Sequence, residues 1–177
     1  METAFSWLGT IAETLINAFP HLKIVDVTQG GVKMRRGVEI IELTPGLCFY
    51  WPLITVIRVI PVVRDTLELS AQTFATKDGK TVLATGMITY SVRDVVKLLT
   101  TAPDYVNTIN DLAVAAIHDV LKQHDWEALQ TSNDDLRREL KRAVTDALSG
   151  FGVRIISVGL KDLAPCKVFK LVQDSSN

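Results

Sequence analysis

Cysteine and histidine are scarce in this 177-residue chain, which contains two cysteines and three histidines. Cys48 and Cys166 lie far apart and form no C-x-x-C pair, so a disulfide framework is not indicated and a reducing compartment is the default expectation. His118 and His124 are six residues apart, a spacing that does not bring two side chains to one helix face as joint metal ligands. The sequence therefore predicts no metal site.

An excess of basic residues is also lacking, because 19 Lys and Arg balance 20 Asp and Glu, for a net charge of −1. Nucleic-acid-binding proteins usually carry a basic excess or a basic stripe, so no nucleic acid is expected as a partner. KMRR at 33–36 is the only basic cluster. We interpret it as a solvated strand and turn, with contact to anionic lipid head groups as the lesser alternative.

Motifs for catalysis and for cofactor binding are missing as well. The chain has no G-x-S-x-G, H-E-x-x-H or paired-carboxylate signature. GKT at 79–81 invites comparison with a phosphate-binding loop, but that motif needs a glycine where Phe74 stands. We therefore predict no catalytic residue and no cofactor, and hence a protein that is not an enzyme.

The N-terminal segment lacks the features of a signal peptide and of a membrane span. A secretory signal starts with a positive region, whereas the first lysine here is Lys23. Residues 4–19, AFSWLGTIAETLINAF, are nearly long enough to cross a bilayer. Glu13 and Asn17 would then lie in hydrocarbon, where an acidic residue near mid-span costs ~2.5–3.5 kcal/mol.

What residues 4–19 do have is a clean separation of polar and apolar side chains on a helical wheel. Pro20 ends this helix. We therefore assign residues 1–21 to one amphipathic helical segment, predicted to associate with a membrane. Two interpretations stay open: a helix packed on the protein's own core, and an interfacial helix with its apolar face among acyl chains. For the interfacial helix, the residues expected to contact the membrane are Phe5, Trp7, Leu8, Ile11, Leu15, Ile16 and Phe19.

The rest of the chain predicts an α+β fold. Residues 22–93 are rich in strand patterns, with turns at Gly30-Gly31 and Asp78-Gly79. Residues 94–165 predict a short helix, a long helix opening at Pro103, a third helix capped by Ser132 or Asn133, and a closing strand VRIISVGL. Residues 166–177 hold too few apolar positions for a coiled coil.

PGLCFYWPLI at 45–54 places Phe49, Tyr50 and Trp51 consecutively in what we interpret as a turn region between prolines. Consecutive side chains of extended backbone point to opposite faces, so at least one ring is expected to face outward rather than into the β core. Trp and Tyr favour the membrane–water interface. These three residues are therefore added to the expected membrane contacts.

Four segments, in order along the chain, resemble the SPFH or band 7 domain of stomatins, prohibitins and flotillins. They are PGLCFYWPLI, TKDGKTVLATGMITYSV, DVLKQHDWEAL and FGVRIISVGLKDL, and the resemblance covers about 22–165, nearest to the stomatin branch. The residues that match family positions are Pro45, Gly46, Leu47, Phe49, Pro52, Thr76, Asp78, Val82, Tyr90, Val92, Gly152, Val153, Ile155, Val158, Leu160 and Asp162.

The resemblance implies a β-rich first half of the domain followed by an α/β second half. It implies a non-enzymatic scaffold on the cytoplasmic face of a membrane, with membrane lipid and further copies of itself as partners, in a ring or cage. Such assemblies organise membrane microdomains or modulate a membrane protease or channel. The resemblance favours the interfacial interpretation of the N-terminal helix. From a different class, the alternative is a soluble adaptor whose N-terminal helix docks into a groove of a partner protein.

Overall fold

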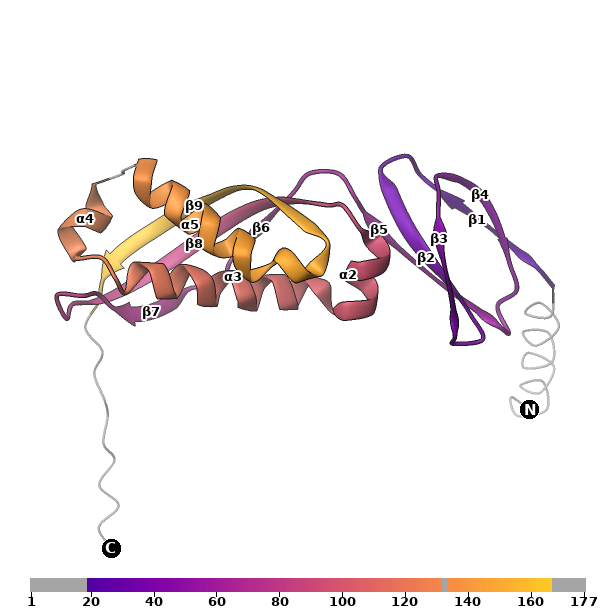
Figure 1. Ribbon diagram of the computed structural model, residues 1–177, viewed down its shortest axis with the longest axis horizontal. Coiled ribbons are helices and arrows are strands. Elements are labelled where there is room, and N and C mark those ends of the chain that lie inside the picture. Colours follow the sequence, from indigo (N-terminus) through magenta and orange to yellow (C-terminus); the bar gives the residue numbers. More distant parts are fainter. Residues whose placement is uncertain (1–18, 132–133, 167–177) are drawn as a thin grey trace, which may run out of the picture. The chain divides into compact units, whose positions relative to one another are not determined.

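A computed structural model describes residues 19–131 and 134–166, and it has the α+β character that the sequence predicts (Figure 1). The predicted helix at 4–19 lies outside the described residues except for Phe19, as do Ser132, Asn133 and most of the C-terminal tail. The strands are β1 His21–Val25, β2 Gln29–Arg35, β3 Glu39–Leu43, β4 Gly46–Tyr50, β5 Thr55–Pro61, β6 Asp65–Glu68, β7 Gln72–Ala75, β8 Thr81–Val92 and β9 Val153–Pro165. The helices are α2 Val95–Thr101, α3 Tyr105–Leu121, α4 Trp126–Gln130, α5 Asp134–Ala147 and the short 3₁₀ helix η2 Ser149–Phe151.

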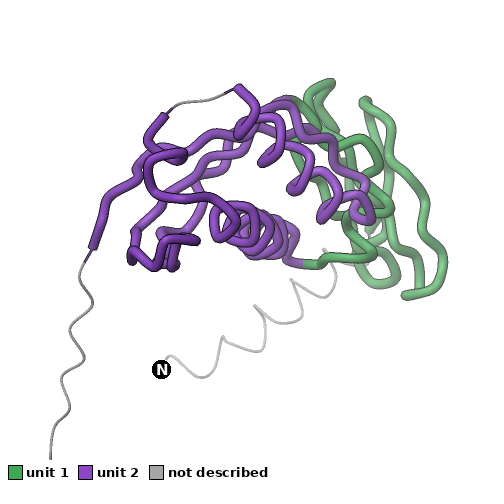
Figure 2. The backbone as a smooth tube through the Cα atoms, turned by 60° about the vertical axis from the view of Figure 1, so that its left-hand side comes forward, with its two compact units in different colours: residues 1–63, 92–103 green, residues 64–91, 104–177 purple. Residues whose placement is uncertain are grey.

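The chain forms two compact units (Figure 2). Unit 1 comprises Met1–Val63 and Val92–Pro103, and unit 2 comprises Arg64–Ser91 and Asp104–Asn177. The chain leaves unit 1 after β5, returns to it with α2, and leaves it again. The units therefore do not coincide with the two halves of the domain, 22–93 and 94–165, into which the sequence pattern divides.

Unit 1 consists of a two-stranded ribbon, β1 with β4, and a three-stranded antiparallel sheet in the order β3-β2-β5. Val32 in the central strand is fully buried, as is Leu98 of α2. Asp94 caps α2 by accepting a hydrogen bond from the Lys97 N–H at 2.8 Å. Burial of apolar side chains between the sheet and a short helix supplies the core of this unit.

Gly30 and Gly31 lie inside β2, so the prediction of a turn at this pair is wrong. A Cβ on Gly30 would lie 2.8 Å from Val95 Cγ2, and one on Gly31 would lie 2.7 Å from the Arg58 carbonyl oxygen. The two glycines are needed because α2 and β5 approach the strand closely. The turn lies instead at 36–38, between β2 and β3, where Arg36 and Gly37 have positive φ values of 52° and 71°.

Unit 2 is built on β8, a strand of 12 residues that pairs with β6 and β7 and also with β9. Helices α3 and α5 lie side by side over this sheet (Figure 1). Asp104 caps α3, so Pro103 precedes the cap rather than opening the helix. Ile109, Ala113 and Ile117 of the predicted apolar stripe are buried.

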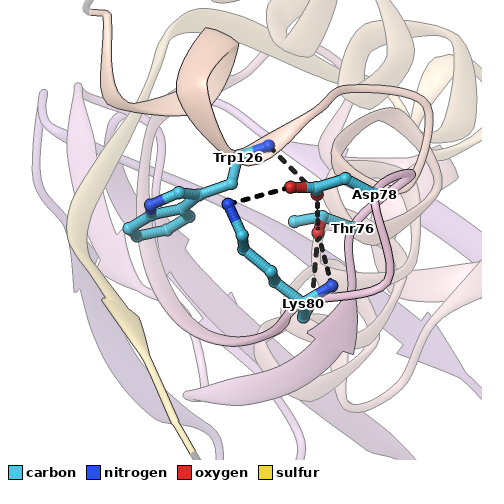
Figure 3. Close-up of polar contacts among 4 residues, drawn as sticks. All are labelled: Thr76, Asp78, Lys80 and Trp126. Carbon is cyan, nitrogen blue, oxygen red and sulfur yellow. Dashed lines mark hydrogen bonds and ion pairs between the residues drawn. The ribbon is translucent and has the colours of Figure 1, made fainter.

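The hairpin between β7 and β8 turns at Asp78-Gly79, as predicted, with Gly79 at φ 78°. The Thr76 hydroxyl donates to Asp78 Oδ1 and accepts from the Lys80 N–H at 3.1 Å (Figure 3). Asp78 also accepts from the Trp126 N–H at 3.3 Å and pairs with Lys80 Nζ at 3.1 Å. The carboxylate therefore joins the hairpin to the start of α4.

These contacts lower the pKa of Asp78 from 3.8 to about 2, chiefly through the Thr76 hydrogen bond. A carboxyl group whose pKa is lower in the folded than in the unfolded state stabilises the folded protein when the pH is above the unfolded-state pKa. This stabilisation is lost as the pH falls through the folded-state pKa. We therefore expect Asp78→Asn to melt below wild type at neutral pH. The difference should narrow as pH falls from about 4 to about 2, because protonation removes the charge from wild type.

Thermal melting monitored by circular dichroism at several pH values measures this difference. Asp119→Asn, which changes an exposed carboxylate on α3, is the matched control and should melt like wild type at every pH. A constant gap between wild type and Asp78→Asn from neutral pH to pH 2 would mean that the charge of Asp78 does not stabilise the hairpin.

Candidate membrane-contacting surface

The ribbon of β1 and β4 carries four large apolar side chains on one face. In the antiparallel register, Leu22 lies opposite Phe49 and Ile24 lies opposite Leu47. Directly opposed residues, and residues two apart on one strand, share a face. All four are exposed, at 57% for Leu22, 65% for Ile24, 63% for Leu47 and 61% for Phe49. We call these four residues the apolar ribbon face.

The opposite face of the ribbon makes contacts within the ribbon and with the rest of unit 1. Val25 at the end of β1 is 2% exposed. The rings of His21 and Tyr50 lie 5.9 Å apart, centroid to centroid. Lys33 Nζ of β2 donates to the carbonyl oxygen of Phe49 at 2.7 Å. The face that carries Val25 and Tyr50 is therefore partly covered, with Lys23 exposed on it, while the apolar ribbon face is left open.

The sequence predicts that the aromatic residues 49–51 lie in a turn region, but two of the three lie at the end of a strand. Phe49 and Tyr50 belong to β4, and the turn begins at Trp51, whose carbonyl accepts from the Ile54 N–H at 3.2 Å. Phe49 and Trp51 are exposed, at 61% and 48%, while Tyr50 is half-buried. The interpretation of Phe49 and Tyr50 as turn residues is wrong, because both pair with β1.

Of the predicted contacts in the N-terminal helix, only Phe19 is described, and it is 68% exposed. The structure does not describe Phe5, Trp7, Leu8, Ile11, Leu15 and Ile16. Leu22, Ile24 and Leu47 are exposed apolar residues that were not predicted from the sequence. Their signal is the alternation of apolar residues in HLKIV and GLCFY, which places these side chains on one face but does not reveal whether that face is covered.

A second apolar surface of unit 1 lies on the β3-β2-β5 sheet. Ile40, Met34 and Val56 form a row across the three strands, by their register. A groove on this side is lined by these three residues and by Leu53, Leu99 and Pro103. Ile40, Leu53 and Val56 are exposed, at 44%, 65% and 59%. Unit 1 therefore presents apolar side chains on its sheet as well as on its ribbon.

The titratable groups with shifted pKa values serve structural contacts. Burial, with a lesser effect of the Asp65 carboxylate, raises the pKa of Tyr90 to about 12. The hydrogen bond to Glu68 raises the pKa of Lys161, whose Nζ lies 2.7 Å from the Glu68 carboxylate. In the described ranges, no group of three or more His, Cys, Asp or Glu side chains is placed to hold a metal ion. None of the helices described between 19 and 166 has the length and hydropathy to cross a membrane.

Comparison with known proteins supports a family assignment. The model of the SPFH domain / band 7 family matches residues 23–174. An uncharacterised protein of Archaeoglobus fulgidus is 24% identical over 89% of this chain and 63% of its own length. A stomatin homolog of Pyrococcus horikoshii is 25% identical over 80% of this chain and 53% of its own length. A putative band 7 family protein of Acanthamoeba polyphaga mimivirus is 21% identical over 69% of this chain and 40% of its own length.

The chain thus spans between 40% and 63% of the length of these curated relatives. The family match itself covers the elements from residue 23 of β1 to the end of β9, including most of the ribbon and the Asp78 hairpin. The matched region contains the four segments whose sequences resemble this family. This chain belongs to the SPFH domain / band 7 family.

Proposed function

We propose that this protein is a non-enzymatic, membrane-associated scaffold that contacts one leaflet through unit 1. The observation that carries the proposal is the apolar ribbon face. Each of its four side chains is roughly three-fifths exposed. Fully burying such a side chain contributes ~1.5–3 kcal/mol, so the face offers on the order of 4–7 kcal/mol on entering acyl chains. Contiguous exposed apolar patches are typical of surfaces that bind a membrane or another protein.

The N-terminal helix is proposed as a second contact with the same leaflet. Its predicted apolar half ends at Phe19, which is exposed and lies two residues before β1. Next to Phe49 of the apolar ribbon face, Tyr50 and Trp51 would lie at the membrane–water interface, where Tyr and Trp are favoured. The assignment to the cytoplasmic face belongs to this proposal and rests on the family resemblance.

Ile11→Glu with Leu15→Glu tests the helix. We expect this double variant to lose most of its flotation with phosphatidylcholine vesicles, because two carboxylates would have to enter the acyl boundary. Thr10→Glu with Thr14→Glu, on the predicted polar half, is the matched control and should float like wild type. Undiminished flotation of the first variant would remove the helix from the proposal.

Self-association completes the proposed scaffold. Proteins named stomatin homologs are among the relatives of this chain. We propose that copies assemble on the membrane, and the groove between Met34 and Leu53 is a candidate surface for contact between copies. Assemblies of this kind would organise membrane microdomains or modulate a membrane protease or channel. Sizing of vesicle-bound protein after chemical crosslinking measures whether assemblies larger than a monomer form.

A soluble adaptor is the second candidate, because exposed apolar side chains also suit the groove of a partner protein. The two proposals differ when the purified chain is mixed with phosphatidylcholine vesicles and no other protein. A scaffold anchored by unit 1 floats with the vesicles. An adaptor stays in the soluble fraction until its partner is added.

A further inference from the structure

Strand alternation divides the basic segment at 33–36. Lys33 and Arg35 lie on one face of β2, Met34 lies on the other, and Arg36 lies in the turn that follows. On their face, Lys33 lies between Ile41 and Ile57 of the neighbouring strands. The structure therefore places two cations on the same side of the sheet, two residues apart.

These two cations line an open pocket with aromatic and apolar walls. The other residues of the pocket are Pro20, Ile41, Phe49, Tyr50, Trp51, Ile54 and Thr55. The Lys33 ammonium is positioned by its 2.7 Å hydrogen bond to the Phe49 carbonyl, which leaves two of its three protons for a ligand. Arg35 is exposed, and the described residues supply no hydrogen bond or ion pair to its guanidinium.

One acidic residue has to be weighed against this basic pair. Glu39 lies opposite Arg35 in the register of β2 and β3 and therefore shares its face. No ion pair within 4.0 Å joins the two side chains in the described part of the chain. Two cations against one carboxylate leave an excess of positive charge, and an exposed pair at longer range is weakened by water and salt.

Resting on the membrane association proposed above, we infer that Lys33 and Arg35 bind the phosphate of an anionic phospholipid head group. Phe49 belongs both to the pocket and to the apolar ribbon face. When that face lies among acyl chains, the pocket opens beside it, near the depth of the head groups. Ammonium and guanidinium groups form charge-assisted hydrogen bonds with phosphate oxygens, and Tyr and Trp rings suit this depth. The inferred ligand is therefore a lipid phosphate with net negative charge.

Cosedimentation of the full chain with two kinds of vesicle tests the inference. One kind contains phosphatidylcholine only, and in the other part of it is replaced by phosphatidylglycerol. Wild type should bind the anionic vesicles more tightly. Lys33→Gln with Arg35→Gln should lose roughly 30-fold in affinity for them, which corresponds to about 1 kcal/mol for each cation. Its affinity for neutral vesicles should stay the same.

Two further variants keep the test interpretable. Arg35→Gln alone leaves the Lys33–Phe49 hydrogen bond intact and should lose about five-fold on anionic vesicles. Lys122→Gln with Arg142→Gln removes the same charge from exposed positions of unit 2 and should bind both vesicle types like wild type. Inorganic phosphate and glycerol phosphate, added as competitors, should not displace wild type from anionic vesicles, because neither carries acyl chains.

The outcomes separate this inference from the proposed function. Equal binding of wild type and Lys33→Gln with Arg35→Gln to anionic vesicles would overturn the lipid-phosphate site while leaving the scaffold proposal intact. An equal loss in the unit 2 control would show a general charge effect and would overturn it too. Displacement by inorganic phosphate would indicate a site for the free anion instead. Failure of wild type to bind either vesicle type would count against the proposed function itself.

Discussion

Replacing Ile24 and Leu47 by glutamate is expected to weaken binding to phosphatidylcholine vesicles by at least about 100-fold. Both side chains are more than 60% exposed, so the changes should leave the fold intact. They remove two apolar groups that would otherwise enter the acyl boundary, and they add two carboxylates that have to stay in water. The lost transfer free energy is roughly 3 kcal/mol or more, which converts to about two orders of magnitude in affinity.

A control with the same change in charge shows whether the ribbon is responsible. Val106→Glu with Ala115→Glu places two carboxylates at exposed positions of α3 in unit 2 and should float like wild type. Circular dichroism melting of all variants checks that the fold persists. If the ribbon variant melts like wild type and still floats, the apolar ribbon face does not hold this protein to lipid.

Gly31→Val is expected to lower the free energy of unfolding by about 3 kcal/mol, although valine is the better strand former. A Cβ at this position would lie 2.7 Å from the Arg58 carbonyl oxygen and 3.2 Å from Val59 Cγ2. The carbonyl belongs to β5, which pairs with β2 here, so relief requires the strands to separate. Strand propensity differs by at most ~1 kcal/mol between residues, whereas overpacking typically costs ~1–3 kcal/mol and occasionally more.

Urea unfolding monitored by circular dichroism measures this loss. Gly150→Ala is the matched control, because a Cβ at Gly150 meets nothing within 4 Å. Its free energy of unfolding should stay within about 0.5 kcal/mol of wild type. A Gly31→Val variant as stable as wild type would mean that β5 does not approach Gly31 as closely as the structure shows.

Much of the second unit could be predicted from local pattern. Ile109, Ala113 and Ile117 recur at helical spacing and are buried, and Asp78-Gly79 has the chemistry of a hairpin turn. The prediction of a turn at Gly30-Gly31 is wrong because glycine is typical both of turns and of places where two backbones approach closely. The residues that decide between the two, Val95 and Arg58, are distant in sequence, so only the three-dimensional structure distinguishes them.

The candidate surface was predictable only in part. Phe49 and Trp51 were predicted as membrane contacts because they belong to a run of three aromatic residues, and both are exposed. Leu22 and Ile24 alternate with His21 and Lys23 in the same way as residues of a half-buried strand. Alternation identifies a face but not its covering, because covering depends on contacts with other elements. The register of β1 with β4 is what joins these residues to Leu47 and Phe49 as one surface.

The most direct measurement uses an environment-sensitive fluorophore on the ribbon itself. Ile24→Cys is labelled in a chain whose Cys48 and Cys166 are replaced by serine, and Lys122→Cys is labelled in the same background as a reference in unit 2. On addition of phosphatidylcholine vesicles, we predict that emission from position 24 shifts to the blue and is quenched by brominated acyl chains, while position 122 changes little. Unchanged emission from position 24 on vesicles that carry the protein would contradict the account.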